Sequence, residues 1–184
     1  FAESRRNAAD EIIEQRFGKK VLYSNPLALI IGGVSPYFVM NKEQILELTR
    51  SCWAWATRNK HGLMVTTSRR TPLEVEDALA VEFSGEGFDN THFVWGRKDT
   101  FNPLPALLPR ACAAVVTEDS ISMISEAILQ GHRPIVVRLT QKRQSRKLAR
   151  FQNHLVLSGL ARWIDTEKVG EVLMNDSDEI SKSP

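Results

Sequence analysis

The sequence predicts an α/β fold in which a mostly parallel, Rossmann-like sheet has helices on both faces. Short, wholly apolar runs such as residues 27–31 are typical of strands that are buried on both faces. These runs alternate along the chain with segments whose apolar residues recur at helical spacing. Such alternation, without an internal repeat, favours right-handed βαβ units and therefore a parallel sheet.

The first two strands are expected at residues 27–31 and 63–67, with a helix between them. Asn41 predicts the start of this helix, because Gln44 three residues later completes a capping box. A second helix follows the strand at 63–67. Its predicted N-cap is Thr71, which precedes a proline and then a glutamate at the third helical position.

Three further strands are expected at residues 91–95, 113–117 and 135–137. The segments between and after them predict a short helix at 102–108, a helix at 120–130 that ends before Gly131, and a long helix at 141–157. We therefore expect a Rossmann-like domain over residues 27–173, preceded by a helical or linker segment at 1–26 and followed by a flexible tail at 174–184.

The composition excludes several classes of protein. The 184 residues carry a net charge of +2, which is too small to indicate nucleic acid binding. The two cysteines, Cys52 and Cys112, and the four histidines show no metal-ligand spacing, so neither a metal site nor a cofactor is expected. No apolar run is long enough to span a bilayer, and reduced cysteines suit the cytoplasm. Because the chain begins at Phe1, we expect it to be the C-terminal part of a larger protein.

The ends of two predicted strands meet where a ligand is expected. In open α/β sheets, ligands bind beyond the carboxyl ends of the strands, where the strand order reverses. Gly32 and Gly33 follow the first strand, and residues 117–122 follow the fourth. Gly32-Gly33 would allow a ligand to approach the backbone closely, or it would simply form a tight turn.

The helix at 120–130 presents polar residues at its start. Ser122, Ser125 and Glu126 share one face, where backbone N–H groups would bind a phosphate and Glu126 would accept hydrogen bonds from a ribose diol. The alternative is that Asp119 or Ser120 is only an N-cap and Glu126 is only solvated. Both interpretations remain open on the sequence.

Other candidates follow the second and third strands. Ser68, Arg69 and Arg70 would hold a phosphate or carboxylate, although a solvated arginine pair is an equal alternative. Trp95 would stack on a base or else pack in the core. A run of cations without acidic residues would contact an anion or a protein partner, or would be a solvated helix face: Arg138, Lys142, Arg143, Arg146, Lys147 and Arg150.

Two motifs carry a family resemblance. Residues 66–72 (Thr-Thr-Ser-Arg-Arg-Thr-Pro) and 115–127 (Val-Val-Thr-Glu-Asp-Ser-Ile-Ser-Met-Ile-Ser-Glu-Ala) resemble the mitochondrial-fission ELM (elongated mitochondria) family, which has many bacterial members of undefined activity. The similarity extends from about Leu27 to Leu160. The family resembles the C-terminal half of the GT-B glycosyltransferases, which bind nucleotide sugars.

This resemblance implies roles for individual residues. Glu126 matches the ribose-binding glutamate, Ser120 and Ser122 match the diphosphate-binding turn after Thr117, and Trp95 loosely matches the tryptophan of the nucleotide-sugar signature. The sequence departs from the pattern at Glu118 and Asp119, which should repel an anionic donor unless Arg69 and Arg70 or a metal offset them. No catalytic base is assigned, since it would lie in an N-terminal domain absent from this chain.

Three functions are consistent with the sequence. The first is a nucleotide-sugar-binding domain related to GT-B glycosyltransferases. The second is a non-catalytic scaffold for protein contacts, as the fission role of the family implies. The third and weakest is a nucleoside-diphosphate-sugar epimerase, because the glycine-rich turn and Tyr-x-x-x-Lys pair of such enzymes are missing. The sequence alone does not decide whether the protein is an enzyme.

Overall fold

The computed structural model describes residues 2–18, 21 and 25–176, with the side chains of residues 2–6 left out. Its centre is a six-stranded sheet in which every neighbouring pair of strands is parallel. This confirms the predicted α/β class. In spatial order the strands are β4 (Thr91–Val94), β3 (Leu63–Thr66), β1 (Leu27–Ile30), β5 (Ala113–Thr117), β6 (Ile135–Val137) and β8 (Arg162–Ile164).

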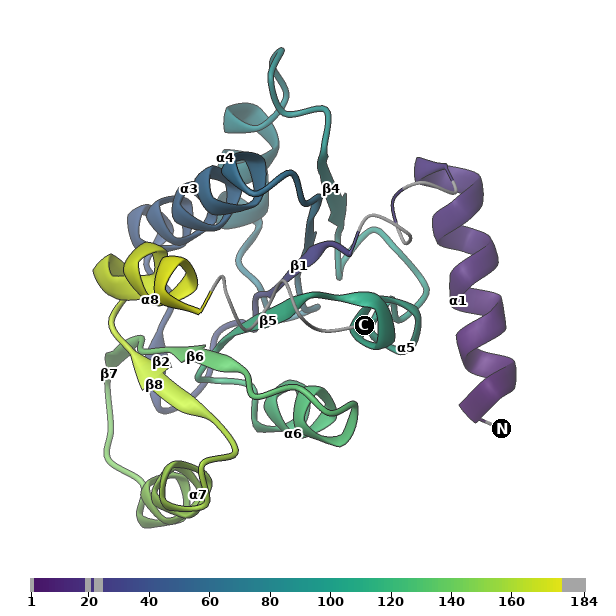
Figure 1. The fold of residues 1–184 in the computed structure, drawn as a ribbon. Helices are drawn as coiled ribbons and strands as arrows, with labels where there is room; N and C mark the ends of the chain where they lie inside the picture. Colours follow the sequence, from purple (N-terminus) through teal and green to yellow (C-terminus); the bar gives the residue numbers. More distant parts are fainter. Residues whose placement is uncertain (1, 19–20, 22–24, 177–184) are drawn as a thin grey trace.

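Helices cover both faces of the sheet (Figure 1). One face is covered by α3 (Lys42–Arg58), α4 (Leu73–Glu82) and α8 (Val169–Asn175). The opposite face is covered by α1 (Ala2–Phe17), α5 (Leu104–Leu107), α6 (Ile121–Leu129) and α7 (Arg146–Leu157). Two single turns of 3₁₀ helix, Leu108–Arg110 and Thr166–Lys168, complete the connections.

The alternation of side chains along the strands divides the core into two layers. Leu27 and Leu29 of β1 pack under α3 and α4, whereas Ala28 and Ile30 point to the opposite face. All four side chains are fully buried. Burial on both faces explains why this strand is a continuous apolar run rather than an alternating one.

Several elements were not predicted from the sequence. Two short strands, β2 (Phe38–Val39) and β7 (Thr140–Gln141), form a small antiparallel pair. Gln141, which was expected to be the first residue of the helix at 141–157, therefore belongs to β7. That helix, α7, starts five residues later, where the Ser145 hydroxyl accepts a hydrogen bond from the Leu148 amide at 3.4 Å. The edge strand β8 and the helix α8 were also missed.

Two of the predicted helix starts have different outcomes. Asn41 is the N-cap of α3, and its side chain accepts a hydrogen bond from the Gln44 amide at 3.1 Å, as predicted. The prediction that Thr71 is the N-cap of α4 is wrong, because Pro72 occupies that position. The Thr71 hydroxyl instead donates to the Gly32 carbonyl and accepts from the Ser68 amide.

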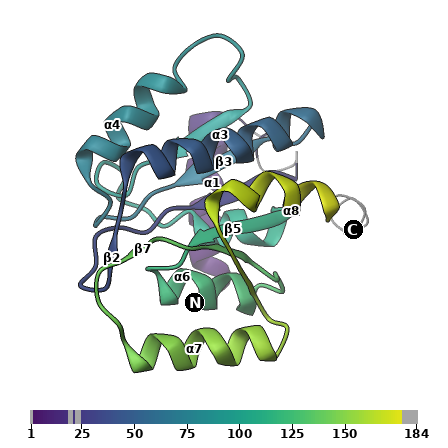
Figure 2. The ribbon, with the colours of Figure 1, turned by 90° about the vertical axis from the view of Figure 1, so that its left-hand side faces the viewer.

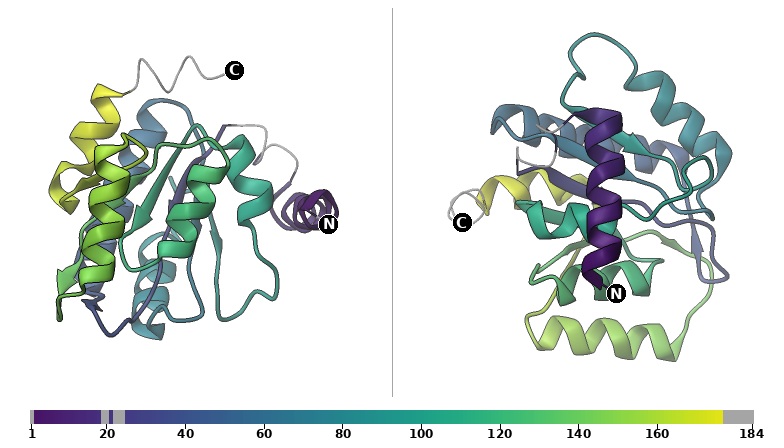
Figure 3. Two further views of the ribbon diagram at one scale, coloured as in Figure 1. Left: turned by 90° about the horizontal axis from the view of Figure 1, so that it is seen from below. Right: turned by 90° about the vertical axis from the view of Figure 1, so that its right-hand side faces the viewer.

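The segment expected at 1–26 contains α1, which packs on α5 at the side of the molecule remote from α7 (Figure 3). Ile13 is fully buried there, and Asp10 forms a two-pronged ion pair with Arg110 at 2.6 and 2.9 Å. Of the tail expected at 174–184, residues 174 and 175 belong to α8, and residues 177–184 lie outside the described part of the chain. Among the described residues, no helix has both the length and the apolar character needed to span a bilayer.

Candidate functional site

The strand order reverses between β1 and β5, as the sequence predicted. The chain proceeds from β1 outward to β3 and β4 on one side, and then returns to β5, β6 and β8 on the other. The loops after β1 and β5 therefore diverge at the carboxyl edge of the sheet, which is the position where open α/β sheets bind ligands.

Hydrogen bonds within the chain join these two loops. The Gly32 amide donates to the Thr117 hydroxyl at 2.8 Å, and the Gly33 amide donates to the Asp119 carboxylate at 2.7 Å. The Thr117 hydroxyl in turn donates to the other Asp119 oxygen at 2.8 Å. The two glycine amides, which were candidate ligand contacts, are thus bound to side chains of the protein itself.

The glycines are required because the protein approaches them closely. A Cβ atom on Gly32 would overlap the Asp119 carboxylate, and one on Gly33 would overlap the backbone carbonyl of Arg70. The Val34 amide also donates to the Arg70 carbonyl at 2.9 Å. The loops after β1, β3 and β5 therefore form one packed layer at the switch point.

A pocket of about 710 Å³ opens beside this layer, and we call it the carboxyl-edge pocket. It brings together Ser68, Arg69 and Arg70 from the end of β3 with Ser122 and Glu126 from α6. The two groups are more than fifty positions apart in the sequence. The remaining walls are the ends of β3 and β4, the segment from Gly96 to Leu104, and Met123.

The first turn of α6 has no side-chain cap. Ser120 occupies the N-cap position, but its side chain makes no capping hydrogen bond, and the Asp119 carboxylate points to Gly33 instead. The alternative interpretation is thus right about the N-cap position of Ser120, but neither side chain makes a capping hydrogen bond. An uncapped helix start leaves backbone N–H groups available to an anion.

The pocket is lined by three guanidinium groups, those of Arg69, Arg70 and Arg97, and by two carboxylates. Asp99 is already engaged, because it forms an ion pair with Arg16 and accepts a hydrogen bond from the Trp95 amide at 2.6 Å. Glu126 is half-buried, and its carboxylate makes no hydrogen bond or ion pair with any residue that the structure describes. Burial raises the pKa of Glu126 above its usual value.

Besides Gly32, Gly33, Thr117 and Asp119, which bind to one another, three further candidate residues stay outside the lining of the pocket. Trp95 stacks on Phe93 with ring centroids 4.7 Å apart and packs against the core under α3 and α4. Ser120 is buried, and Ser125 lies on α6 beside the pocket-lining residues without being one of them. Ligand binding by these residues stays a prediction that the pocket does not support.

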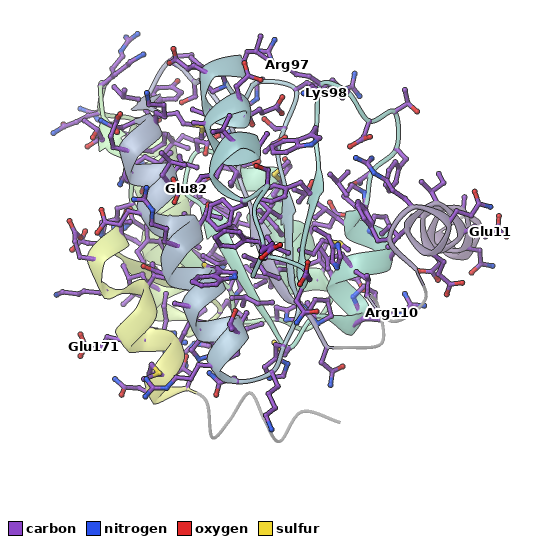
Figure 4. All side chains as sticks on the ribbon, turned by 90° about the horizontal axis from the view of Figure 1, so that it is seen from above. Glu11, Glu82, Arg97, Lys98, Arg110 and Glu171 are labelled. Carbon is purple, nitrogen blue, oxygen red and sulfur yellow. The ribbon has the colours of Figure 1, made fainter. Side chains whose placement is uncertain are left out.

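Arg97 was missed by the sequence reasoning. It follows β4 as Arg69 follows β3, so the rule that selected the first arginine pair also selects this one. Its Nε donates to the Thr71 carbonyl at 2.9 Å, which holds the guanidinium against the loop after β3, and Arg97 lines the pocket. Figure 4 shows Arg97 and Arg110 at opposite ends of the sheet, with Arg97 at the carboxyl edge.

The two carboxylates that were expected to repel a diphosphate point away from the start of α6. The Asp119 side chain is fully buried against Gly33 and Thr117, with Arg70 Nη2 at 3.7 Å from Oδ2. Glu118 accepts a hydrogen bond from the Leu139 amide at 2.6 Å, on the other side of the loop. Burial is the main reason that the pKa values of both groups are raised.

The sequence matches the family described as Mitochondrial fission ELM1 over residues 2–183. The chain belongs to this family. No curated protein matches the sequence.

Two solved structures place this family member among the Rossmann and GT-B-like folds. A protein described as a "putative UDP-N-acetylglucosamine 2-epimerase" from Listeria monocytogenes is 14% identical, with a TM-score of 0.60 over 89% of this chain. The "glycotransferase of kitacinnamycin" is 18% identical, with a TM-score of 0.52 over 88% of this chain. The ELM1 family chain corresponds to only 40% and 36% of the lengths of those two chains, and the similarity establishes the fold alone.

Proposed function

We propose that the carboxyl-edge pocket binds a nucleotide sugar. The observation that carries this proposal is the convergence of Arg69 and Arg70 with Ser122 and Glu126 on one pocket. Guanidinium groups match the oxygens of a diphosphate, and a carboxylate matches the paired hydroxyls of a ribose. A nucleoside diphosphate presents both groups a few bonds apart.

The start of α6 and the end of β3 supply the diphosphate site in this proposal. The uncapped amides of α6 add hydrogen-bond donors and the positive end of the helix dipole. The nearby Asp119 carboxylate does not oppose the ligand strongly, since it is buried, held by two donors and lies beside Arg70.

Glu126 supplies the ribose site. It lies one turn into α6, so its carboxylate is set back from the helix start by about the distance between a diphosphate and the ribose hydroxyls. Its lack of a partner among the described side chains leaves both oxygens able to accept hydrogen bonds. The names of the two similar proteins, one for a UDP-sugar and one for glycosyl transfer, agree with this ligand class. For the whole protein we propose sugar transfer from a nucleotide donor.

Binding of UDP and UDP-N-acetylglucosamine should raise the thermal stability of the chain. A saturating ligand is expected to stabilise the fold by roughly 2 to 4 kcal/mol at one hundred to one thousand times its dissociation constant. Glu126→Gln should weaken binding at least about tenfold, because hydrogen bonds to a charged group each contribute on the order of 1.5 to 3 kcal/mol. Differential scanning fluorimetry and calorimetric titration measure both effects.

Glu171→Gln is the matched control, because this exposed glutamate of α8 lies at the end of the molecule opposite Arg97 (Figure 4). It should leave the affinity unchanged. If no member of a nucleotide and nucleotide-sugar panel stabilises the chain, the proposal is wrong and the scaffold function gains support. If Glu126→Gln and Glu171→Gln weaken binding equally, Glu126 is not part of the binding site.

The affinity for UDP should also depend on pH through Glu126. Because burial raises the pKa of this group, the carboxylate becomes protonated at a pH above its usual value and then loses acceptor capacity. Affinity is expected to fall as the pH is lowered through that raised pKa. Titration of the ligand phosphate affects the wild type and Glu126→Gln alike, so the ratio of their dissociation constants reports on Glu126 alone. If this ratio stays constant from neutral pH to pH about 4.5, the prediction is wrong.

A further inference from the structure

A second cavity of about 700 Å³ lies at the carboxyl ends of β5 and β6, against the start of α7. Its walls come from β7 and from the turns of α7 that face the sheet. Figure 2 shows the chain running from β7 down to α7, which lies beside α6. Glu118, the first residue after β5, lines this cavity, and no residue of the carboxyl-edge pocket does.

Glu118 is the only acidic residue in the lining of the second cavity. One carboxylate oxygen accepts the hydrogen bond from the Leu139 amide, and the Trp163 side chain also hydrogen-bonds to this group. These contacts fix the direction of the carboxylate while leaving acceptor capacity, since an ionised carboxylate accepts about four hydrogen bonds. A half-buried acceptor in a cavity suits a ligand that carries hydroxyl groups.

The cavity also carries positive charge. Arg138 and Arg146 both line it, and no aspartate or glutamate occurs between Glu126 and Asp165 in the sequence. Arg138 has a loose ion pair with Asp165 at 3.7 Å, in which both side chains are about half exposed. Arg146 has no ion pair with any residue in the described part of the chain. A phosphate or carboxylate would supply the counter-charge at this point.

The remaining polar lining consists of Ser145, whose hydroxyl caps α7, and three glutamine amides. Gln141, Gln144 and Gln152 each offer both a donor and an acceptor, which is the mixed capacity that sugar hydroxyls need. Phe38, Leu139 and Leu148 give the cavity an apolar side on which the C–H face of a sugar ring can pack. Cations, a single carboxylate, amides and an apolar wall thus meet in one concave site.

From this arrangement we infer that the second cavity binds a small hydroxyl-rich anion, of the class of sugar phosphates and sugar acids. Arg138 and Arg146 bind the anionic group, and Glu118 with the glutamines binds the hydroxyls. This site is independent of the proposed nucleotide pocket, because the two cavities share no lining residue and lie on opposite sides of the loop between Glu118 and Ser122.

Binding of glucose 6-phosphate, measured by calorimetric titration of the chain, tests this inference. Arg146→Gln should raise its dissociation constant about tenfold or more, because a charge-assisted hydrogen bond to the anion is lost. Lys147→Gln is the matched control: it removes the same charge from the next residue of α7, which is exposed and outside the lining. Its effect should stay below about twofold, because Lys147 does not line the cavity and acts on the ligand only through screened charge.

The specificity of the cavity is tested with two fragments of the probe. Glucose should bind more weakly than glucose 6-phosphate because it lacks the anion, and inorganic phosphate should bind more weakly because it lacks the hydroxyls. Glu118→Gln should weaken glucose 6-phosphate binding but leave inorganic phosphate unaffected. Arg138→Gln gives a second test of the anion contact if Arg146→Gln lowers the melting temperature.

Three outcomes would overturn the inference. These are no saturable binding of glucose 6-phosphate, equal losses in Arg146→Gln and Lys147→Gln, and inorganic phosphate binding as tightly as glucose 6-phosphate. Equal losses in the two variants would mean that the anion is attracted to the basic face of α7 as a whole. Equally tight binding of inorganic phosphate would mean that the sugar hydroxyls make no contact with the cavity. The UDP titration of the same variants should stay unchanged, so failure here is distinguishable from failure at the nucleotide pocket.

Discussion

Gly33→Ala is expected to lower the free energy of unfolding by about 3 kcal/mol, at the upper end of the range for overpacked positions. The added Cβ would overlap the backbone carbonyl of Arg70, and backbone atoms cannot rotate away as a side chain can. Moving the loop would also strain two hydrogen bonds, that from the Gly33 amide to Asp119 and that from the Val34 amide to the Arg70 carbonyl. The effect should therefore be large although only one methyl group is added.

Urea and thermal unfolding measure this effect. For a chain of this size each kcal/mol corresponds to roughly 2 to 4 °C, so a fall of about 6 to 12 °C is expected. Gly85→Ala is the matched control, since a Cβ there meets no atom within 4 Å and its φ is not in the left-handed region. If both alanine variants unfold at the same temperature, the loops after β1 and β3 are not packed as described.

The fold could largely be predicted because local signals and the tertiary arrangement agree. The strands at the centre of the sheet are buried on both faces, so their apolar runs mark them in the sequence. The edge strand β8 carries no such run: Arg162, Trp163 and Ile164 are all only half-buried. The pair β2–β7 is two residues long on each side and depends on a contact between residues a hundred positions apart, which no local pattern encodes.

The location of the site was also predictable, whereas the direction of each side chain was not. Ser68 and Arg69 were placed at one edge by a strand end and Glu126 by the helix that follows the fourth strand, and the structure brings these three into one pocket. Asp119 and Thr71 look like helix caps in the sequence, because short polar side chains before a helix usually are. Both are used instead to join the loop after β1 to its neighbours, since buried glycine amides and carbonyls there need partners.

Asp119→Ala is expected to destabilise the chain by about 3 kcal/mol. The substitution leaves the Gly33 amide and the Thr117 hydroxyl without their acceptor. Each unsatisfied buried group costs on the order of 1 to 3 kcal/mol. Asp119→Asn should cost less, about 1 to 2 kcal/mol, since it keeps one acceptor oxygen and the same size. Asp77→Ala, at an exposed position of α4, should change stability by less than about 0.5 kcal/mol.

The same variants separate the structural role of Asp119 from a role in binding. Its carboxylate is fully buried and its two oxygens accept hydrogen bonds from Gly33 and Thr117, so the folded Asp119→Asn protein should retain the UDP affinity of the wild type within about twofold. Glu126→Gln should show the opposite pattern, with weakened UDP binding and an unchanged melting temperature, because its carboxylate faces the pocket without a partner among the described residues. If Asp119→Asn weakens UDP binding about tenfold without affecting unfolding, the buried carboxylate belongs to the ligand site, and the structural role assigned to Asp119 is wrong.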